Sequence, residues 1–146
     1  MTTAAQILSS KSDKTIYTTT PAASVFEAVK LMADKNIGAL VVMEGKTVVG
    51  LITERDYARK IVLMARSSKE TRVRDIMTSQ VICVRSDQTN EECMALITEK
   101  RLRHLPVMDN GKLIGLISIG DLVKDIISEQ QFTIQQLEHY ITGERG

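Results

Sequence analysis

Two short stretches of the chain place an alcohol and a carboxylate at the same spacing. Residues 50–56 and 115–121 each form an apolar run that ends at a hydroxyl residue, with an aspartate three positions later. The apolar run predicts a buried strand, and apolar residues after Thr53 recur at the spacing of a helix. A hydroxyl at a helix start lies beside unpaired backbone N–H groups, which can bind a phosphate. An aspartate one turn later suits the hydroxyl groups of a sugar.

A second interpretation of these pairs is purely structural. Thr53 with Asp56, and Ser118 with Asp121, have the spacing of a capping box, in which each side chain bonds to the backbone N–H of the other residue. Capping residues are common, so one such pair does not distinguish a binding site from a helix cap. The occurrence of two pairs in register favours a shared role.

Both stretches belong to a longer internal repeat with an offset of 65 residues. The same offset pairs Glu27 with Glu92 and Leu40 with Leu105, and no gap is needed between positions 17 and 122. An ungapped repeat of this length indicates one supersecondary unit used twice. With only two copies, we expect a closed pair that packs about a pseudo-twofold axis and buries both apolar faces.

Apolar periodicity and turn residues predict the order strand, helix, strand, strand, helix in each repeat. The elements expected in the first repeat are a strand at 16–18, a helix from Ser24, strands at 40–43 and 47–52 and a helix at 53–64. Those expected in the second are a strand at 81–84, a helix at 89–100, strands at 104–108 and 112–117 and a helix at 118–128. A last amphipathic helix is expected at 131–141. This order predicts an α+β fold with small mixed sheets.

The repeat divides the chain into five expected segments. They are an N-terminal helix or turn that docks on the body (1–14), the first repeat (15–65), a linker (66–80), the second repeat (81–128) and a C-terminal helix (129–146). The C-terminal helix could cover the body or contact a partner.

The composition argues against several classes of function. The 146 residues include 19 basic and 18 acidic side chains, so no broad field for a polyanion is expected. Three tyrosines, two phenylalanines and no tryptophan argue against a stacking surface for single-stranded nucleic acid. No apolar run approaches the roughly 20 residues of a membrane span, and no signal peptide is evident. Cys83 and Cys93 lack a metal or disulfide spacing, which favours a reducing cytoplasm.

Catalytic and metal-binding patterns are not evident in the sequence. His104 and His139 have no metal-ligand partner at helical spacing, and no nucleophilic triad can be built on them. Residues 111–115 are expected to form a turn and a strand rather than a glycine-rich phosphate loop. We therefore expect a protein that is not an enzyme.

Two sets of motifs occur in the same order and at one offset. They are Leu40-Val41-Val42 with Gly50-Leu51-Ile52-Thr53 and Asp56, and Leu105-Pro106-Val107 with Gly115-Leu116-Ile117-Ser118 and Asp121. In combination they closely resemble a tandem pair of cystathionine β-synthase (CBS) domains, and the resemblance covers about residues 7–127. It implies a non-catalytic sensor whose repeats enclose a cleft for an adenosine nucleotide. It also implies a flat homodimer of two stacked pairs.

The resemblance further implies roles for individual residues. Thr53 and Ser118 would bind phosphate or ribose through their hydroxyls. Asp56 and Asp121 would accept hydrogen bonds from the ribose hydroxyls. The residues expected to border the adenine, mainly through backbone groups, are Gly38, Ala39, His104 and Leu105. Those expected to close the pocket edges are Thr18, Thr19, Thr20, Cys83 and Val84.

The two repeats differ at positions that bear on this site. Arg101, Arg103 and His104 stand where the first repeat has small or neutral residues. We hypothesise that Arg103, with Arg101 or His104, crosses the cleft and neutralises the phosphates of a nucleotide held by Thr53 and Asp56. Alternatively, the arginines form a solvated helix end that complements the helix dipole, and His104 is an ordinary strand histidine.

Other charges favour the first junction as the better equipped site. Arg55 and Lys60 lie on the helix expected after Thr53, where they could add positive charge. In the second copy, Ile119-Gly120 replaces Glu54-Arg55. One occupied site and two sites of unequal affinity both fit this pattern.

Two classes of function remain open. In the first, an adenine nucleotide binds between the repeats, shifts their arrangement and so signals to an unidentified effector protein. AMP is the expected ligand, with ATP, ADP, NAD(H) and S-adenosylmethionine as alternatives. In the second, the pair is a structural module that dimerises and docks a partner through the last helix, with an empty pocket.

Overall fold

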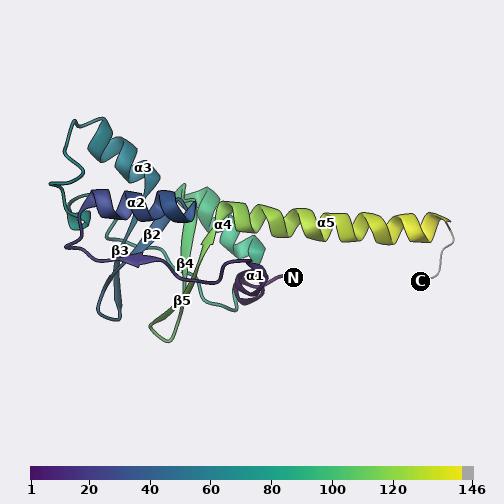
Figure 1. Ribbon diagram of the computed structural model, residues 1–146. Helices are drawn as coiled ribbons and strands as arrows, with labels where there is room; N and C mark the ends of the chain where they lie inside the picture. The colour runs from purple at the N-terminus through teal and green to yellow at the C-terminus, as the bar shows by residue number, and fades with distance from the viewer. Residues whose placement is uncertain (143–146) are drawn as a thin grey trace.

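The chain folds into two similar halves and a long C-terminal helix (Figure 1). The computed structural model describes residues 1–142. Helices and strands are mixed within each half, as expected for an α+β fold. The predicted segment 129–146 also includes residues 143–146, which lie outside the described residues.

The first half is a three-stranded sheet with helices. Its strands are β1 (Thr18–Thr19), β2 (Ala39–Glu44) and β3 (Thr47–Thr53). Its helices are α2 (Val25–Lys35), the short α3 (Glu54–Tyr57) and a π-helical continuation, η1 (Ala58–Val62). β1 runs parallel to β2, and β2 runs antiparallel to β3, so the sheet is mixed.

The second half repeats this plan with a two-stranded sheet. Its elements are α4 (Asn90–Lys100), β4 (His104–Asp109), β5 (Lys112–Ser118) and α5 (Ile119–Thr142). A short helix precedes each half along the chain: α1 (Ala4–Ser10) and the 3-10 turn η2 (Val73–Asp75).

The β-hairpins of the two halves have the same register. Ala39 pairs with Thr53 in the first hairpin, and His104 pairs with Ser118 in the second. Each hairpin also has a register shift at the equivalent position. The repeat found in the sequence is therefore a structural repeat, and the predicted fold class is confirmed.

β2 is buried on both faces, which explains its continuous apolar sequence. Leu40 and Val42 belong to the core of the first half. Ala39 and Val41 point the other way, as alternate residues of a strand do, and meet Leu113 of β5 in a separate core. The two sheets therefore pack against each other and form the closed pair that the sequence predicts.

Each of the two short helices, α1 and η2, docks on the half that it does not directly precede in the chain, and both dock in an equivalent way. α1 packs in the core of the second half, and η2 packs in the core of the first. The Asn90 N–H donates to the Thr2 carbonyl at 2.8 Å, and the Val25 N–H donates to the Thr71 carbonyl at 2.9 Å. The N-terminal segment therefore serves the second repeat, although the first repeat follows it in the chain.

Two predicted strands are shorter than expected. The strand predicted at 16–18 is β1, which contains only Thr18 and Thr19. The strand predicted at 81–84 is reduced to a single parallel bridge between Val84 and Val107. Both segments lie at the edge of a sheet, where they pair on one side only, so local apolar pattern does not fix how many residues pair.

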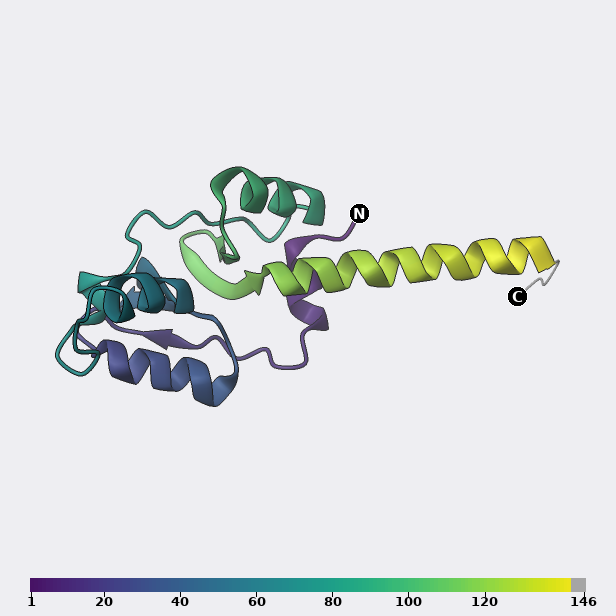
Figure 2. The same cartoon turned by 90° about the horizontal axis from the view of Figure 1, so that it is seen from above.

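The prediction of separate helices at 118–128 and 131–141 is wrong, because they form the single helix α5. No glycine or proline occurs between Asp121 and Thr142, so nothing interrupts the backbone hydrogen bonds. The far half of α5 projects from the body in both views and does not cover it (Figures 1 and 2). In the first half, the helix predicted at 53–64 ends at Val62. Within residues 1–142, no helix has the length and apolar composition required to cross a bilayer.

Close packing at Gly50 gives a test of this fold. A Cβ at Gly50 would lie 2.5 Å from Met77 Sδ and 3.1 Å from the Thr78 carbonyl oxygen. We expect Gly50→Ala to lower the free energy of unfolding by about 1–3 kcal/mol, because overpacking forces side-chain and backbone shifts. Urea denaturation measures this change.

Gly120→Ala is the matched control. A Cβ at Gly120 would have only Ser118 Oγ nearby, at an ordinary 3.6 Å, and alanine favours a helix over glycine. We expect it to leave stability unchanged or to raise it. An unfolding midpoint of Gly50→Ala equal to that of the wild type would contradict the close approach at Gly50.

Candidate functional site

The second strand-to-helix junction is closed by a reciprocal cap. The Asp121 N–H donates to Ser118 Oγ at 3.1 Å, and the Ser118 N–H donates to Asp121 Oδ2 at 2.9 Å. This is the capping geometry that the spacing allowed. Lys11 Nζ also lies 3.2 Å from Oδ2 of Asp121, so both contacts of the carboxylate fall on one oxygen.

At the first junction, both carboxylate oxygens of the aspartate have partners. Asp56 Oδ2 accepts from the Thr53 N–H at 3.0 Å, and Lys60 Nζ lies 3.2 Å from Asp56 Oδ1. Lys60 also donates to the Ile76 carbonyl at 2.8 Å. Asp56 is 9% exposed. The two junctions are thus alike in their caps but unlike in the source of the cation.

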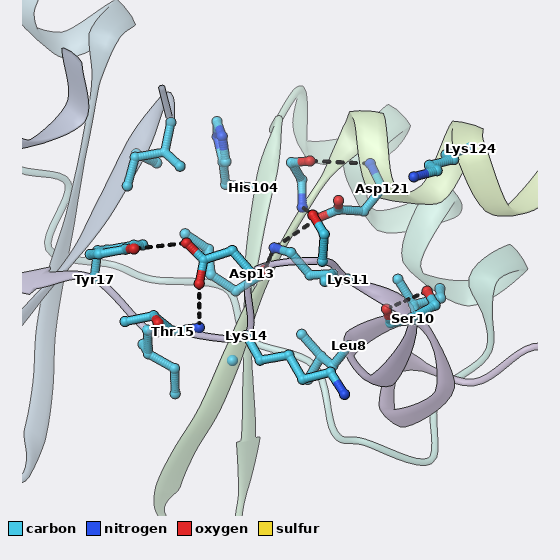
Figure 3. A pocket seen from close by; sticks show the side chains of 18 of the residues that line it. Leu8, Ser10, Lys11, Asp13, Lys14, Thr15, Tyr17, His104, Asp121 and Lys124 are labelled. Carbon is cyan, nitrogen blue, oxygen red and sulfur yellow. Dashed lines mark hydrogen bonds and ion pairs between the residues drawn. The ribbon is translucent and has the colours of Figure 1, made fainter. Parts of the chain in front are cut away.

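A cavity of about 740 Å³ opens at the second junction (Figure 3). Its walls come from three parts of the chain: residues 7–17, residues 35–39 of the first half, and Ser118 and Asp121 with their neighbours in the second half. Ligand pockets for small molecules commonly measure about 300–1,000 Å³. The cavity therefore has the size of a small-molecule site and lies between the two repeats.

Five of the predicted site residues line this cavity. They are Gly38, Ala39, His104, Ser118 and Asp121. The others lie elsewhere. Thr53, Arg55, Asp56 and Lys60 lie at the first junction, Thr18 and Thr19 form β1, and Thr20 follows it. Arg101 and Arg103 are exposed before β4, Cys83 is exposed, and Val84 and Leu105 are buried in the core. The arrangement brings together the second junction and the edge of the first half. The sequence had favoured the first junction.

His104 spans the cavity toward the first half. A Cβ at Gly38 would lie 3.1 Å from Glu54 Oε1 and 3.4 Å from His104 Cε1, so the ring of His104 lies close to the first half at this position. Among the described residues, nothing bonds to the buried His104 Nδ1. Burial lowers the pKa of His104, Lys11 and Arg103 lower it further, and Asp121 acts in the opposite direction. The imidazole is therefore neutral at pH 7 and can offer one donor and one acceptor.

Residues 9–17 form a cavity wall that the sequence did not reveal. Asp13 holds this segment together, since it accepts from the Thr15 N–H at 3.0 Å and from the Tyr17 hydroxyl at 2.7 Å. Lys35 Nζ lies 5.5 Å from the centre of the Tyr17 ring. No repeat or motif marks the segment, because the part of the repeat without gaps begins only at position 17. Its many polar and charged residues were the only available signal.

The chain belongs to the CBS domain family, whose model matches residues 6–63 and 73–128. A solved structure of a protein with CBS domains from Burkholderia ambifaria MC40-6 is 62% identical, with a TM-score of 0.86, and the match covers 91% of this chain and 99% of that one. The CBS domain pair of protein MJ0100, solved in complex with 5'-methylthioadenosine and S-adenosyl-L-methionine, shares the fold at 24% identity and a TM-score of 0.76, over 88% and 98% of the two chains. A CBS pair is a regulatory module.

A plant relative is longer than this chain. The CBS domain-containing protein CBSX3, mitochondrial, from Arabidopsis thaliana is 44% identical over 125 residues, which make up 82% of this chain and 61% of that protein. The chain thus spans about three fifths of the length of this relative.

The half-buried His104 predicts a pH dependence of stability. Because the pKa of His104 is lowered on folding, the unfolded chain takes up the proton first as the pH falls through the ordinary histidine value of about 6.5. We expect the free energy of unfolding to decrease between about pH 7.5 and pH 5.5, where histidine is the main side chain that titrates. Denaturation curves across this range measure the effect.

His104→Gln should remove most of this dependence, and His139→Gln should retain it. A wild-type stability that stays constant over the range would contradict the lowered pKa of His104.

Proposed function

We propose that the chain is a non-catalytic sensor that binds an adenine nucleotide in the cavity at the second junction, with AMP as the first candidate. The observation that carries this proposal is the cavity of about 740 Å³ that joins Ser118 and Asp121 to the edge of the first half. The MJ0100 structure supports an adenosine ligand, since both of its ligands contain adenosine. ATP, ADP, NAD(H) and S-adenosylmethionine remain further candidates.

Each part of the ligand has a proposed partner in the cavity. Asp121 would accept the ribose hydroxyls, and Ser118 with the start of α5 would bind a phosphate, because a helix N-terminus attracts anions. Gly38 and Ala39 would border one side of the adenine, and the neutral His104 would border the other. The ligand would then touch both repeats, so binding would favour one arrangement of the pair over others. An effector protein would receive this signal.

The first junction is proposed as a second, weaker site. Thr53 and Asp56 would hold the ribose and phosphate there, and Arg55 and Arg103 would add charge. Lys60 Nζ lies 3.2 Å from Asp56 Oδ1, and Asp56 is almost buried. A ligand that binds Asp56 would therefore have to displace Lys60. Thr18 and Thr19 are proposed for the edge of the pocket, and Leu105 would border the adenine through its backbone.

The location that we propose for this function is the cytoplasm. Cys83 and Cys93 are both free thiols, as is usual in a reducing compartment.

A nucleotide panel tests the proposal. AMP at about 100 times its dissociation constant should stabilise the protein by about 2.7 kcal/mol, which thermal unfolding detects as a higher midpoint. Asp121→Asn should weaken AMP binding about tenfold or more, because a charge-assisted contact is lost. Calorimetric titration measures the affinity.

Asp87→Asn is the matched control, since Asp87 is exposed and lies outside the cavity lining. It should bind AMP as the wild type does. Failure of every adenine nucleotide to raise the unfolding midpoint would refute the sensor and leave the structural module.

The projecting helix favours a second candidate function, self-association. Ile127, Ile134, Leu137 and Ile141 are all about half exposed or more, and with Gln130 they follow the alternating three- and four-residue spacing of a heptad repeat. Isoleucine at one heptad position and leucine at the other favours a parallel two-stranded coiled coil. The segment is therefore suited to a second copy of this chain, and we include a homodimer in the proposal.

Ile134→Glu combined with Leu137→Glu should convert this dimer to a monomer, because like charges would face each other across the apolar seam. Light scattering coupled to size-exclusion chromatography measures the mass. The control is Gln135→Glu with Gln136→Glu, which adds the same charge outside the seam and should leave the dimer intact. A monomeric wild type, or a dimer that survives the seam substitutions, would contradict self-association through α5.

A further inference from the structure

Lys11 forms an ion pair with Asp121, the carboxylate proposed to bind the ribose. Its Nζ lies 3.2 Å from Asp121 Oδ2 and donates to the Leu116 carbonyl at 2.9 Å. Figure 3 shows Lys11 reaching from the N-terminal segment toward Asp121, and both residues line the cavity. A ligand that binds Asp121 must therefore displace or share the ammonium group.

The pairing at the first junction has a different origin. There, Lys60 lies one turn after Asp56 on the same helical segment and also bonds to the Ile76 carbonyl. The position in the second half that matches Lys60 is Asp125, a carboxylate. That position of the helix carries an anion in place of the lysine, and the ammonium group that pairs with Asp121 comes from Lys11, outside the repeat.

The backbone at Lys11 is fixed, whereas its side chain can move. Lys11 caps the end of α1, and its N–H donates to the Leu8 carbonyl at 3.3 Å. Leu8 packs closely on Gly115 of β5, and Ile7 is buried in the core. The lysine side chain is a flexible four-carbon stem with three donors, so the ammonium can turn to a new acceptor without movement of α1.

The charges around Lys11 determine which ligands bind more tightly when its ammonium group turns away from Asp121. Asp121 and Asp125 lie one helical turn apart, and both line the cavity. These two carboxylates repel a phosphate unless a cation stands beside them. The cavity lining also includes Lys14, Lys35 and Lys124. Lys11, however, is the lysine that pairs with Asp121, and its side chain is 30% exposed. Lys11 is therefore close enough to supply that charge.

We propose that Lys11 selects phosphorylated adenosine ligands at this site, an inference that rests on the proposed function. The ribose hydroxyls donate to Asp121 in place of Lys11, and the released ammonium pairs with a phosphate oxygen of the same ligand. One ion pair then replaces another. Adenosine breaks the pair with Asp121 and offers no replacement. S-adenosylmethionine offers a carboxylate, but its sulfonium and amino groups bring two positive charges near the ammonium of Lys11.

The experiment compares AMP, adenosine and S-adenosylmethionine by calorimetric titration of the full chain. The wild type should bind AMP at least about tenfold more tightly than either other ligand. Lys11→Met should bind AMP about tenfold more weakly and adenosine at least as tightly as before, so the preference for AMP collapses. Lys11→Arg should keep most of the preference, since the charge remains. Lys46→Met, an equal loss of charge at an exposed turn outside the cavity lining, should bind as the wild type does.

Two results would overturn the inference. One is a Lys11→Met variant that keeps the wild-type ratio of AMP to adenosine affinity. The other, measured on the wild type alone and so independent of how any variant folds, is binding of S-adenosylmethionine or adenosine as tightly as AMP. In either case a ligand still binds, so the sensor stands and only the role of Lys11 fails. If no adenosine compound binds the wild type, the proposed function fails first.

Discussion

The contact between the two sheets fixes the geometry of the whole molecule. Val41 and Leu51 of the first sheet meet Leu113 of the second in a core that belongs to neither half alone. Because the two hairpins have the same register, this contact brings the strand-to-helix junction of one half to the edge of the other. Ser118 and Gly38 therefore line one cavity although they are distant in sequence. Each half supplies only part of the site.

The repeated scaffold holds two unequal junctions. Both use the same reciprocal cap, in which the alcohol and the carboxylate satisfy each other's backbone N–H groups. The cap and the proposed site are compatible, because a carboxylate that bonds to the helix start through one oxygen still has a second oxygen. At the first junction, Lys60 contacts that second oxygen of Asp56. At the second, Lys11 shares the capped oxygen of Asp121. The caps are the same, so the two carboxylates differ in the cation that each one contacts.

The helix α5 connects the candidate site to the exposed apolar seam. It begins directly after Ser118 and continues to Thr142 as one element, about 36 Å long at 1.5 Å per residue. Within the proposed function, a ligand at the junction contacts the same rigid element that carries Ile134 and Leu137. A helix that projects with apolar residues exposed gains little from tertiary packing, so a partner that covers the seam would stabilise it.

The sequence by itself determined the family, the α+β class, the hairpins and the two alcohol–carboxylate junctions, because these features follow from local spacing and from a repeat without gaps. It did not determine that the second junction opens into the cavity of about 740 Å³. That outcome depends on Lys11 and on the wall at residues 9–17, which reach Asp121 only because α1 docks on the second half. The sequence pattern also predicted two helices, at 118–128 and 131–141, where the structure has the single continuous helix α5. Local pattern encodes the elements, whereas contacts between distant segments decide which side chains share a site.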